Sequence, residues 1–387
     1  MNRVIVIAGN MATSFGNSMY VVALLVFIAA EHPSPLNIGA VQVAAHLPIL
    51  LFGAFGGLLA DRGRRPWIIS GTDMARGLCL LSAAVILGFV KNPLFVLLPL
   101  VFFNASMQAF FSPAVISYVL DLKRGRMDLL SLRTGSGHLA SLGGQLAGAA
   151  LYPLLGLIPL LIINGLGFLL SGVSEMFLHH LPGGNASRPR GEFPRLLKSF
   201  FNLCRGRVPV FLYLGMQAVN TLLMVSLPFF LTRRLGLDAR FLGYALAALL
   251  GGSILSGMFL GLSGLAAEMS TLSAYGAALI FAVLCAAASL LPAGSGVLLF
   301  ALLVSAGACQ GWIYLLTVHK LYQSGAGSGA ASRQGMLEAA AAGVLPIGYG
   351  LSTAAAMLFP LDTPWLLRIA AVLAACMGGA GVFGSDE

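Results

Sequence analysis

The sequence predicts an all-α membrane protein in which twelve transmembrane helices form two pseudo-symmetric six-helix bundles. Hydrophobic residues make up 58% of the 387-residue chain, and charged residues only 9%. Apolar stretches recur from one end of the chain to the other, and one long basic segment divides them into two sets of six. Soluble domains carry roughly 25% charged residues, so this composition excludes a water-soluble fold.

Each apolar stretch is long enough to cross a hydrocarbon core of about 30 Å as a helix. Backbone groups in lipid must form hydrogen bonds within their own segment, which favours helices. The predicted spans are 4–29, 38–60, 67–90, 94–119, 130–153, 157–179, 209–231, 241–263, 271–291, 296–318, 336–359 and 364–383. The first span is too long for a signal-peptide core, so we expect the mature protein to retain it.

The distribution of lysine and arginine predicts the orientation in the membrane. With the N-terminus in the cytoplasm, seventeen of these residues lie on the cytoplasmic side and five outside. Both termini are therefore expected in the cytoplasm, and the protein in the cytoplasmic (inner) membrane. The basic residues on the cytoplasmic side face anionic lipid, which explains the net charge of +9. Membrane lipids are therefore expected partners, and nucleic acid is not.

The longest polar stretch, residues 179–209, separates the two sets of spans. It predicts an N-terminal bundle at 1–180, a basic cytoplasmic linker at 181–208 and a C-terminal bundle at 209–387. Within the linker, FPRLLKSFFNLCR alternates apolar and basic residues, which suits a helix lying on the membrane surface. A solvated linker explains the same residues equally well.

The two halves also resemble each other weakly. A shift of 203 or 204 positions pairs Asn17 with Asn220, Gly39 with Gly243, Gly53 with Gly257, and Gly57 with Gly261. Four matches in the same order indicate an ancient duplication. Transporters built from such repeats place the substrate site between the repeats, near the middle of the membrane.

A short charged motif follows the second predicted span, in FGGLLADRGRRPW at 55–67. Together with twelve spans and a basic central loop, it resembles the signature of the major facilitator superfamily: glycine, three residues, Asp-Arg and further basic residues. GTDMARGLCLL at 71–81 and FFSPAVISYV at 110–119 resemble the branch that holds macrolide and siderophore exporters. The resemblance covers the whole chain and implies the major facilitator fold.

In that family the loop after the second span is a cytoplasmic latch, so the resemblance implies gating roles for Gly57, Asp61, Arg62 and Arg65. A glycine at position 57 lets another helix approach closely. The carboxylate of Asp61 can accept hydrogen bonds from arginine or from a helix N-terminus. Alternatively, the arginines only fix the topology. Because Arg64 replaces the second glycine of the motif and the second half lacks the basic residues, any latch is expected to be asymmetric.

Ionisable residues inside spans are functional candidates, because burying a charge in hydrocarbon is costly. Asp73 and Arg76 are three residues apart on the third span, so they share a helix face and can pair. Arg133, near the start of the fifth span, is expected to join them in a conformational gate. Ion pairs that only pack helices are the alternative.

The usual sites of proton exchange are neutral in this chain. Relatives in the exporter branch often carry an acidic residue where Asn17 stands, and the arginine of proton-linked relatives falls on Asn104. The resemblance therefore gives no support for the usual route of proton antiport. The remaining candidates for proton coupling are Glu175, Asp73 and Glu338, with His46 and His138 as alternatives.

In this fold, spans one, four, seven and ten line the central cavity, and each carries an amide near its midpoint. The predicted substrate-binding residues are Asn17, Asn104, Gln108, Gln217, Asn220, Gln310 and Trp312. Amides donate and accept hydrogen bonds without an ionisation cost, although some of them could simply tie helices together. Nearby aromatic and methionine side chains suit a large, partly apolar guest.

These features predict a secondary active transporter that works by alternating access and exports a bulky amphipathic small molecule, such as a drug, macrolide or siderophore. A lipid or lysolipid transporter on the same fold is the alternative, and a scaffold or sensor a third hypothesis. No enzymatic activity, metal or cofactor is expected, because the chain lacks a phosphate-binding loop, a nucleophile elbow and cysteines at metal-ligand spacing. The expected partners are the substrate, membrane lipids and, for an antiporter, protons; a monomer is expected.

Overall fold

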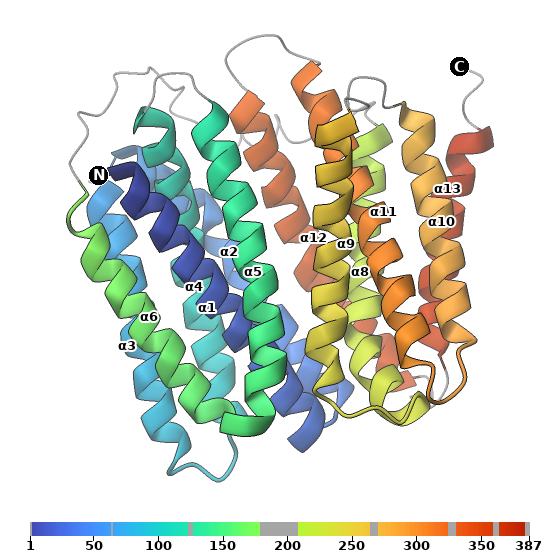
Figure 1. Cartoon of the computed structure of the whole chain (residues 1–387), viewed down its shortest axis with the longest axis horizontal. Coiled ribbons are helices and arrows are strands. Elements are labelled where there is room, and N and C mark those ends of the chain that lie inside the picture. Colours follow the sequence, from blue (N-terminus) through green and yellow to red (C-terminus); the bar gives the residue numbers. More distant parts are fainter. Residues whose placement is uncertain are drawn as a thin grey trace. The chain divides into compact units, whose positions relative to one another are not determined.

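The computed structural model describes residues 2–62, 65–122, 127–178, 208–263, 270–323, 330–358 and 364–383. These residues form twelve α-helices and one short π-helix, with no strand among them (Figure 1). The helices are α1 (Asn2–Glu31), α2 (Pro35–Arg62), α3 (Arg65–Leu87), α4 (Leu94–Leu122), α5 (Met127–Leu155), α6 (Leu157–Glu175), α8 (Val208–Phe229), η1 (Phe230–Arg234), α9 (Phe241–Ser263), α10 (Thr271–Ser289), α11 (Gly296–Gln323), α12 (Ala330–Leu358) and α13 (Trp365–Phe383).

Ten stretches in these helices are long and apolar enough to cross a membrane. Helix α13 contributes a shorter apolar stretch, and α5 is absent from the set because its first half is rich in serine, glycine and charged residues. The prediction of an all-α membrane protein is therefore confirmed. Helix ends differ from the predicted spans by a few residues; the sixth helix, for example, ends at Glu175 rather than at position 179.

The chain folds into two compact units, residues 1–32 with 40–190 and residues 33–39 with 191–387. The division after residue 190 falls in the predicted linker. Most of that linker, including the predicted surface helix, lies outside the described residues.

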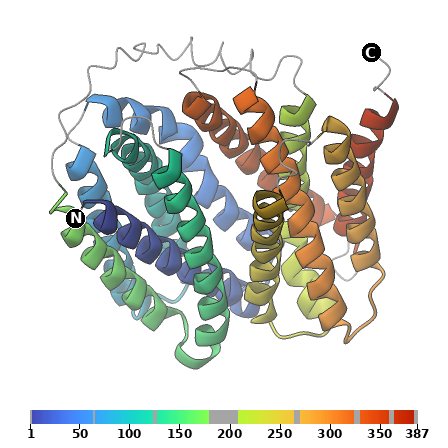
Figure 2. The same ribbon diagram turned by 45° about the horizontal axis from the view of Figure 1, so that its top comes forward.

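The same pairs of helices pack together in both units. In the first unit, α1 packs on α5 and α6, while α3 packs on α4 and α6. In the second unit, α8 packs on α12 and α13, while α10 packs on α11 and α13 (Figures 1 and 2). Helices α1, α3, α4, α5 and α6 of the first unit thus correspond to α8, α10, α11, α12 and α13 of the second. This correspondence supports the duplication predicted from the weak sequence repeat.

Small residues bring α1 and α5 into close contact. A Cβ atom added to Gly144 would collide with the carbonyl oxygen of Phe15, and one added to Gly148 would meet the carbonyl oxygen of Met19. Two glycines four residues apart lie on one helix face and let the two backbones approach, as is common where membrane helices pack.

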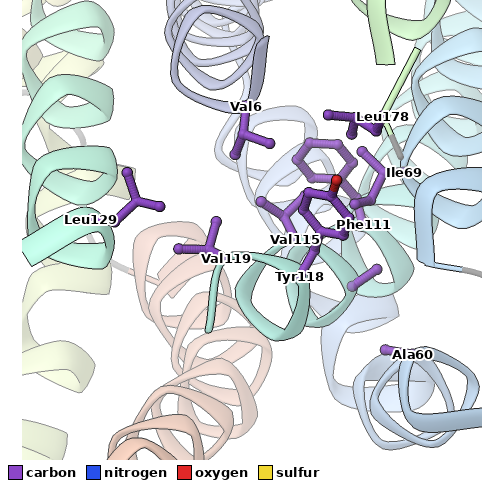
Figure 3. Close-up of a cluster of buried hydrophobic side chains, with 10 residues drawn as sticks. Val6, Ala60, Ile69, Phe111, Val115, Tyr118, Val119, Leu129 and Leu178 are labelled. Atoms are coloured by element: carbon purple, nitrogen blue, oxygen red, sulfur yellow. The ribbon is translucent and has the colours of Figure 1, made fainter. Parts of the chain in front are cut away.

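A cluster of buried apolar side chains fixes the end of the first unit at which α1 begins (Figure 3). Its members come from α1 to α5 and from the turn after α6: Val6, Ala60, Ile69, Phe111, Ala114, Val115, Tyr118, Val119, Leu129 and Leu178. Dense packing of this kind holds the helices in one register. About two turns further along α1, at Thr13, the interior of the unit becomes polar.

Candidate functional site

Polar side chains gather inside the first unit, where α1, α3, α4 and α6 face one another. Asp73 and Arg76 of α3 lie at the centre, with exposed fractions of 0% and 1%. Nη1 of Arg76 lies 3.5 Å from Oδ1 of Asp73, so the structure contains the pair expected from their three-residue spacing. A buried ion pair offsets the cost of desolvation only when further hydrogen bonds satisfy its remaining donors and acceptors.

The guanidinium of Arg76 obtains these bonds from two amides. Nε donates to Oδ1 of Asn104 on α4 over 2.8 Å, and Nη2 donates to Oδ1 of Asn17 on α1 over 3.2 Å. The guanidinium carbon also lies 4.0 Å from the centre of the Phe168 ring on α6, in cation–π geometry. A planar group with five donors can serve several acceptors at once. One side chain of α3 thus joins three other helices.

The carboxylate of Asp73 is bonded on its other side to α1. Thr13 donates from Oγ1 to Oδ2 of Asp73 over 3.1 Å. The same hydroxyl lies 3.4 Å from Oγ of Ser171 on α6, and Ser171 donates to Oε1 of Glu175 over 3.5 Å. We call the connected residues the polar chain: Asn17, Asn104, Arg76, Asp73, Thr13, Ser171 and Glu175.

Glu175 ends the polar chain. Its exposed fraction is 2%, and its second oxygen, Oε2, has no hydrogen-bond partner among the described residues. Helix α1 passes close to this carboxyl group at Gly9, where an added Cβ would lie 3.1 Å from Oε1 of Glu175 and 3.3 Å from Oγ of Ser171. A glycine at this position therefore leaves the space that the two polar side chains of α6 occupy.

The second unit brings two of the predicted amides together. Nε2 of Gln310 on α11 donates to Oδ1 of Asn220 on α8 over 3.1 Å, and both side chains are half-buried. The rings of Tyr213 and Tyr314, from the same two helices, have their centres 5.5 Å apart. Gln217 of α8 is also half-buried. Helices α8 and α11 thus combine amide and aromatic groups.

Two other predicted substrate-binding residues have different surroundings. Nε1 of Trp312 donates to Oγ of Ser273 on α10 over 3.1 Å. The indole N–H therefore takes part in packing between α11 and α10, and the substrate-binding role of Trp312 stays a prediction. Gln108 is half-buried on α4, and within the described part of the structure no side-chain hydrogen bond joins it to the polar chain.

The predicted latch is described only in part. The side chains of Asp61 and Arg62 lie outside the described residues. Arg65 is described, and its Nε donates to the carbonyl oxygen of Ala60 over 3.0 Å. This bond satisfies a carbonyl in the last turn of α2, where such groups lack helical partners.

The close approach expected at Gly57 occurs instead at Gly56. A Cβ added at Gly57 would meet no atom within 4 Å, whereas one at Gly56 would collide with the carbonyl oxygen of Ala109 on α4. Successive residues of a helix point about 100° apart, so a shift of one position changes the neighbouring helix. This result corrects the packing role given to Gly57, and its gating role stays a prediction.

Arg133 and Glu338 complete the predicted set. The carbonyl oxygen of Arg133 accepts a 3.1 Å hydrogen bond from Nδ2 of Asn10, which ties α5 to α1. The charge of Arg133 also acts on Glu175. The side chain of Glu338 lies outside the described residues.

Comparisons with known proteins agree with this architecture. The model of the family described as Major Facilitator Superfamily matches residues 6–346. An uncharacterized MFS-type transporter of Bacillus subtilis (strain 168), YfiS, is 27% identical over 183 residues, which span 44% of this chain and 41% of that relative. The chain therefore matches less than half the length of this relative.

Two solved structures share the fold. The nucleoside transporter NupG has a TM-score of 0.76 at 13% identity, with complete coverage of both chains. A bacterial homolog of the human lysosomal transporter Spinster has a TM-score of 0.72 at 15% identity, and the match covers 99% of this chain and 96% of that one. Identities this low show the fold alone.

Proposed function

Because the chain belongs to the Major Facilitator Superfamily, we propose that it is a secondary active transporter that exports a bulky amphipathic small molecule from the cytoplasm by alternating access. Drugs, macrolides and siderophore-like compounds are the cargo class, as in the exporter branch that its motifs resemble. The observation that carries this proposal is the set of half-buried neutral amides: Asn17, Gln217, Asn220 and Gln310.

The chemistry of these amides suits an amphipathic guest. Amides donate and accept hydrogen bonds, and the paired rings of Tyr213 and Tyr314 offer apolar area on the helices that carry Asn220 and Gln310. Ligand sites of this type are mainly apolar with a few polar groups that set orientation. No uncompensated charge among the described residues bonds to these amides, since Asp73 neutralises Arg76.

The role of Asn104 changes in this proposal. Its exposed fraction is 4% and its Oδ1 atom accepts from Arg76. Asn104 is therefore assigned to positioning the guanidinium, which in turn holds Asn17. Asn17 is half-buried and remains the guest-binding amide of the first unit.

A lipid or lysolipid transporter is the second candidate. Its support is the neutral character of the same amides, which suits a cargo that enters from the bilayer. A scaffold or sensor is the weakest candidate, because a pure scaffold gains little from amides that are only partly engaged with other helices.

Transport assays on purified protein in liposomes separate these candidates. Fluorescent amphipathic dyes should cross the membrane only in liposomes that contain the protein. Gln310→Ala should lower the initial rate about tenfold, equivalent to one hydrogen bond. Ser305→Ala is the matched control, because Ser305 is an exposed residue of the same helix whose hydroxyl bonds within its own helix, to Ala301.

The same liposomes can contain labelled lysolipid. Movement of lysolipid between leaflets without movement of any dye would replace the first candidate with the second. Liposomes in which neither moves would support the scaffold.

A further inference from the structure

Glu175 is a buried carboxyl group with an incomplete set of partners. Within the described part of the chain, Ser171 donates to its Oε1 atom, and its Oε2 atom has no hydrogen-bond partner. The charged groups that act on it are Asp73, Arg76 and Arg133. Burying an ionised carboxylate without a direct ion pair is costly, and uptake of a proton removes that cost.

Two hydroxyl groups connect Glu175 to the charge pair. The steps along this connection are 3.5 Å from Glu175 to Ser171, 3.4 Å from Ser171 to Thr13 and 3.1 Å from Thr13 to Asp73. A hydroxyl both donates and accepts, and either of the two hydroxyls can be the donor to the other. When the hydroxyl groups of Ser171 and Thr13 both rotate, donor and acceptor can therefore exchange roles in the hydrogen bonds that connect Glu175 to Asp73.

From this arrangement we propose that Glu175 is a proton-binding site and that Ser171 and Thr13 relay its proton to Asp73. Glu175 gives its proton to Oγ of Ser171, the hydroxyl proton of Ser171 passes to Thr13, and that of Thr13 passes to Oδ2 of Asp73. Both hydroxyls end neutral, Glu175 becomes a carboxylate and Asp73 becomes a carboxylic acid.

The relay links proton binding to the guest-binding amide through Arg76, which pairs with Asp73 and bonds to Asn17. A protonated Asp73 has no negative charge, so it attracts the guanidinium of Arg76 less strongly, whereas the bonds of that guanidinium to Asn104 and Asn17 remain. Glu175 lies beside Gly9, and Asn17 lies eight residues further along α1, a distance of about 12 Å. Transfer of the proton from Glu175 to Asp73 thus changes the balance of attractions on the guanidinium that bonds to Asn17. This consequence rests on the proposed transport function, whereas proton binding does not.

The structure brings a charged side chain to the two neutral positions at which relatives of the exporter branch carry charges. Positions 17 and 104 are neutral, yet the guanidinium of Arg76 contacts both of their side chains. The acidic and basic groups come from α3 and α6 instead of from α1 and α4. Of the other titratable groups, Arg133 on α5 acts on Glu175, and Tyr20 on α1 acts on Arg76, which pairs with Asp73.

A proton suits this site better than a sodium ion. Protein sites for metal cations such as calcium use about six or more oxygen ligands. The connected oxygens are those of two carboxyl groups and two hydroxyls.

Infrared spectroscopy of the purified full-length protein tests the proton site without a substrate. The wild type should show a carboxylic-acid C=O band that disappears on titration within about pH 4 to 10. Glu175→Gln should remove this band, while Ser171→Ala should retain it. A band that persists in Glu175→Gln, or the absence of any titrating band, would overturn the proposal. Loss of the band in sodium chloride but not in choline chloride would also overturn it, in favour of a cation site.

Liposomes with an imposed pH gradient test the relay. Thr13→Val keeps the shape of the side chain without the hydroxyl, so the gradient should no longer drive dye accumulation, although exchange of dye continues. Thr13→Ser should restore accumulation. Gradient-driven accumulation by Thr13→Val at the wild-type level would refute the relay. Absence of dye movement in the wild type, together with a titrating band, would reject the proposed cargo and retain the proton site.

Discussion

Nε of Arg76 on α3 donates a 2.8 Å hydrogen bond to the amide oxygen of Asn104 on α4. The sequence predicts a gating role for the first residue and a substrate contact for the second. Their contact makes them parts of one buried hydrogen-bonded group, which Asp73 and Asn17 complete. The consequences of this arrangement for stability can be measured.

Arg76→Ala should strongly destabilise the first unit. The substitution leaves the carboxylate of Asp73 buried without its counter-ion, a change that costs about 3–5 kcal/mol in other proteins. Arg76→Lys should recover only part of the loss, because an ammonium cannot reproduce the planar fork that serves Asn17 and Asn104. Unfolding of the detergent-solubilised protein, followed by circular dichroism, measures both. Lys91→Ala, at an exposed position, is the control; equal stability of the Arg76→Ala and Lys91→Ala proteins would contradict the prediction.

Asn104 and Arg76 should be energetically coupled. Asn104→Ala removes a buried acceptor and leaves one guanidinium donor unsatisfied, which costs about 1–3 kcal/mol. In the Arg76→Lys background the same substitution should cost less, with a coupling energy of about 0.5–3 kcal/mol in the double-mutant cycle. Purely additive effects on the unfolding free energy would show that the 2.8 Å contact contributes no stability.

The spacing of residues was enough to predict the Asp73–Arg76 pair, because three residues bring two side chains to one helix face. Composition and span length were likewise enough for the all-α membrane fold. The bonds of Arg76 to Asn17 and Asn104 could not be predicted in this way. They depend on how α1, α3 and α4 are rotated about their axes and how far each is shifted along them. Packing between helices decides this, for example at Gly144 and Gly148 for α1 and at Gly77 for α3.

Thr13, Ser171 and Phe168 were missed for a related reason. A serine or threonine in a membrane helix commonly bonds to a carbonyl of its own helix, as Ser106 does here, so its presence carries no signal of a partner elsewhere. Phe168 is one of many apolar residues of α6, and only the structure shows its ring against the guanidinium of Arg76.

Packing of α1 against α5 should depend on Gly144 far more than on Gly135. A methyl group at Gly144 would collide with the backbone of Phe15, whereas one at Gly135 would meet no atom within 4 Å. Gly144→Ala should therefore lower the unfolding temperature, and Gly135→Ala should leave it unchanged or raise it, since alanine favours a helix by about 1 kcal/mol over glycine. The reverse order of the two unfolding temperatures would show that the two helices do not pack as described.

A similar pair of substitutions in α2 separates packing from gating. Gly56→Ala should impair folding, because its methyl group would collide with the carbonyl oxygen of Ala109, whereas Gly57→Ala has free space within its own unit. Gly57→Ala should therefore express and unfold like the wild type. If the motif at 57–65 acts as a latch, that variant should nevertheless slow dye transport in liposomes, because the added methyl group obstructs a contact made only during the transport cycle. Normal transport together with normal stability would leave Gly57 without a role in gating, and reduced stability of Gly57→Ala would place it in the static packing of α2.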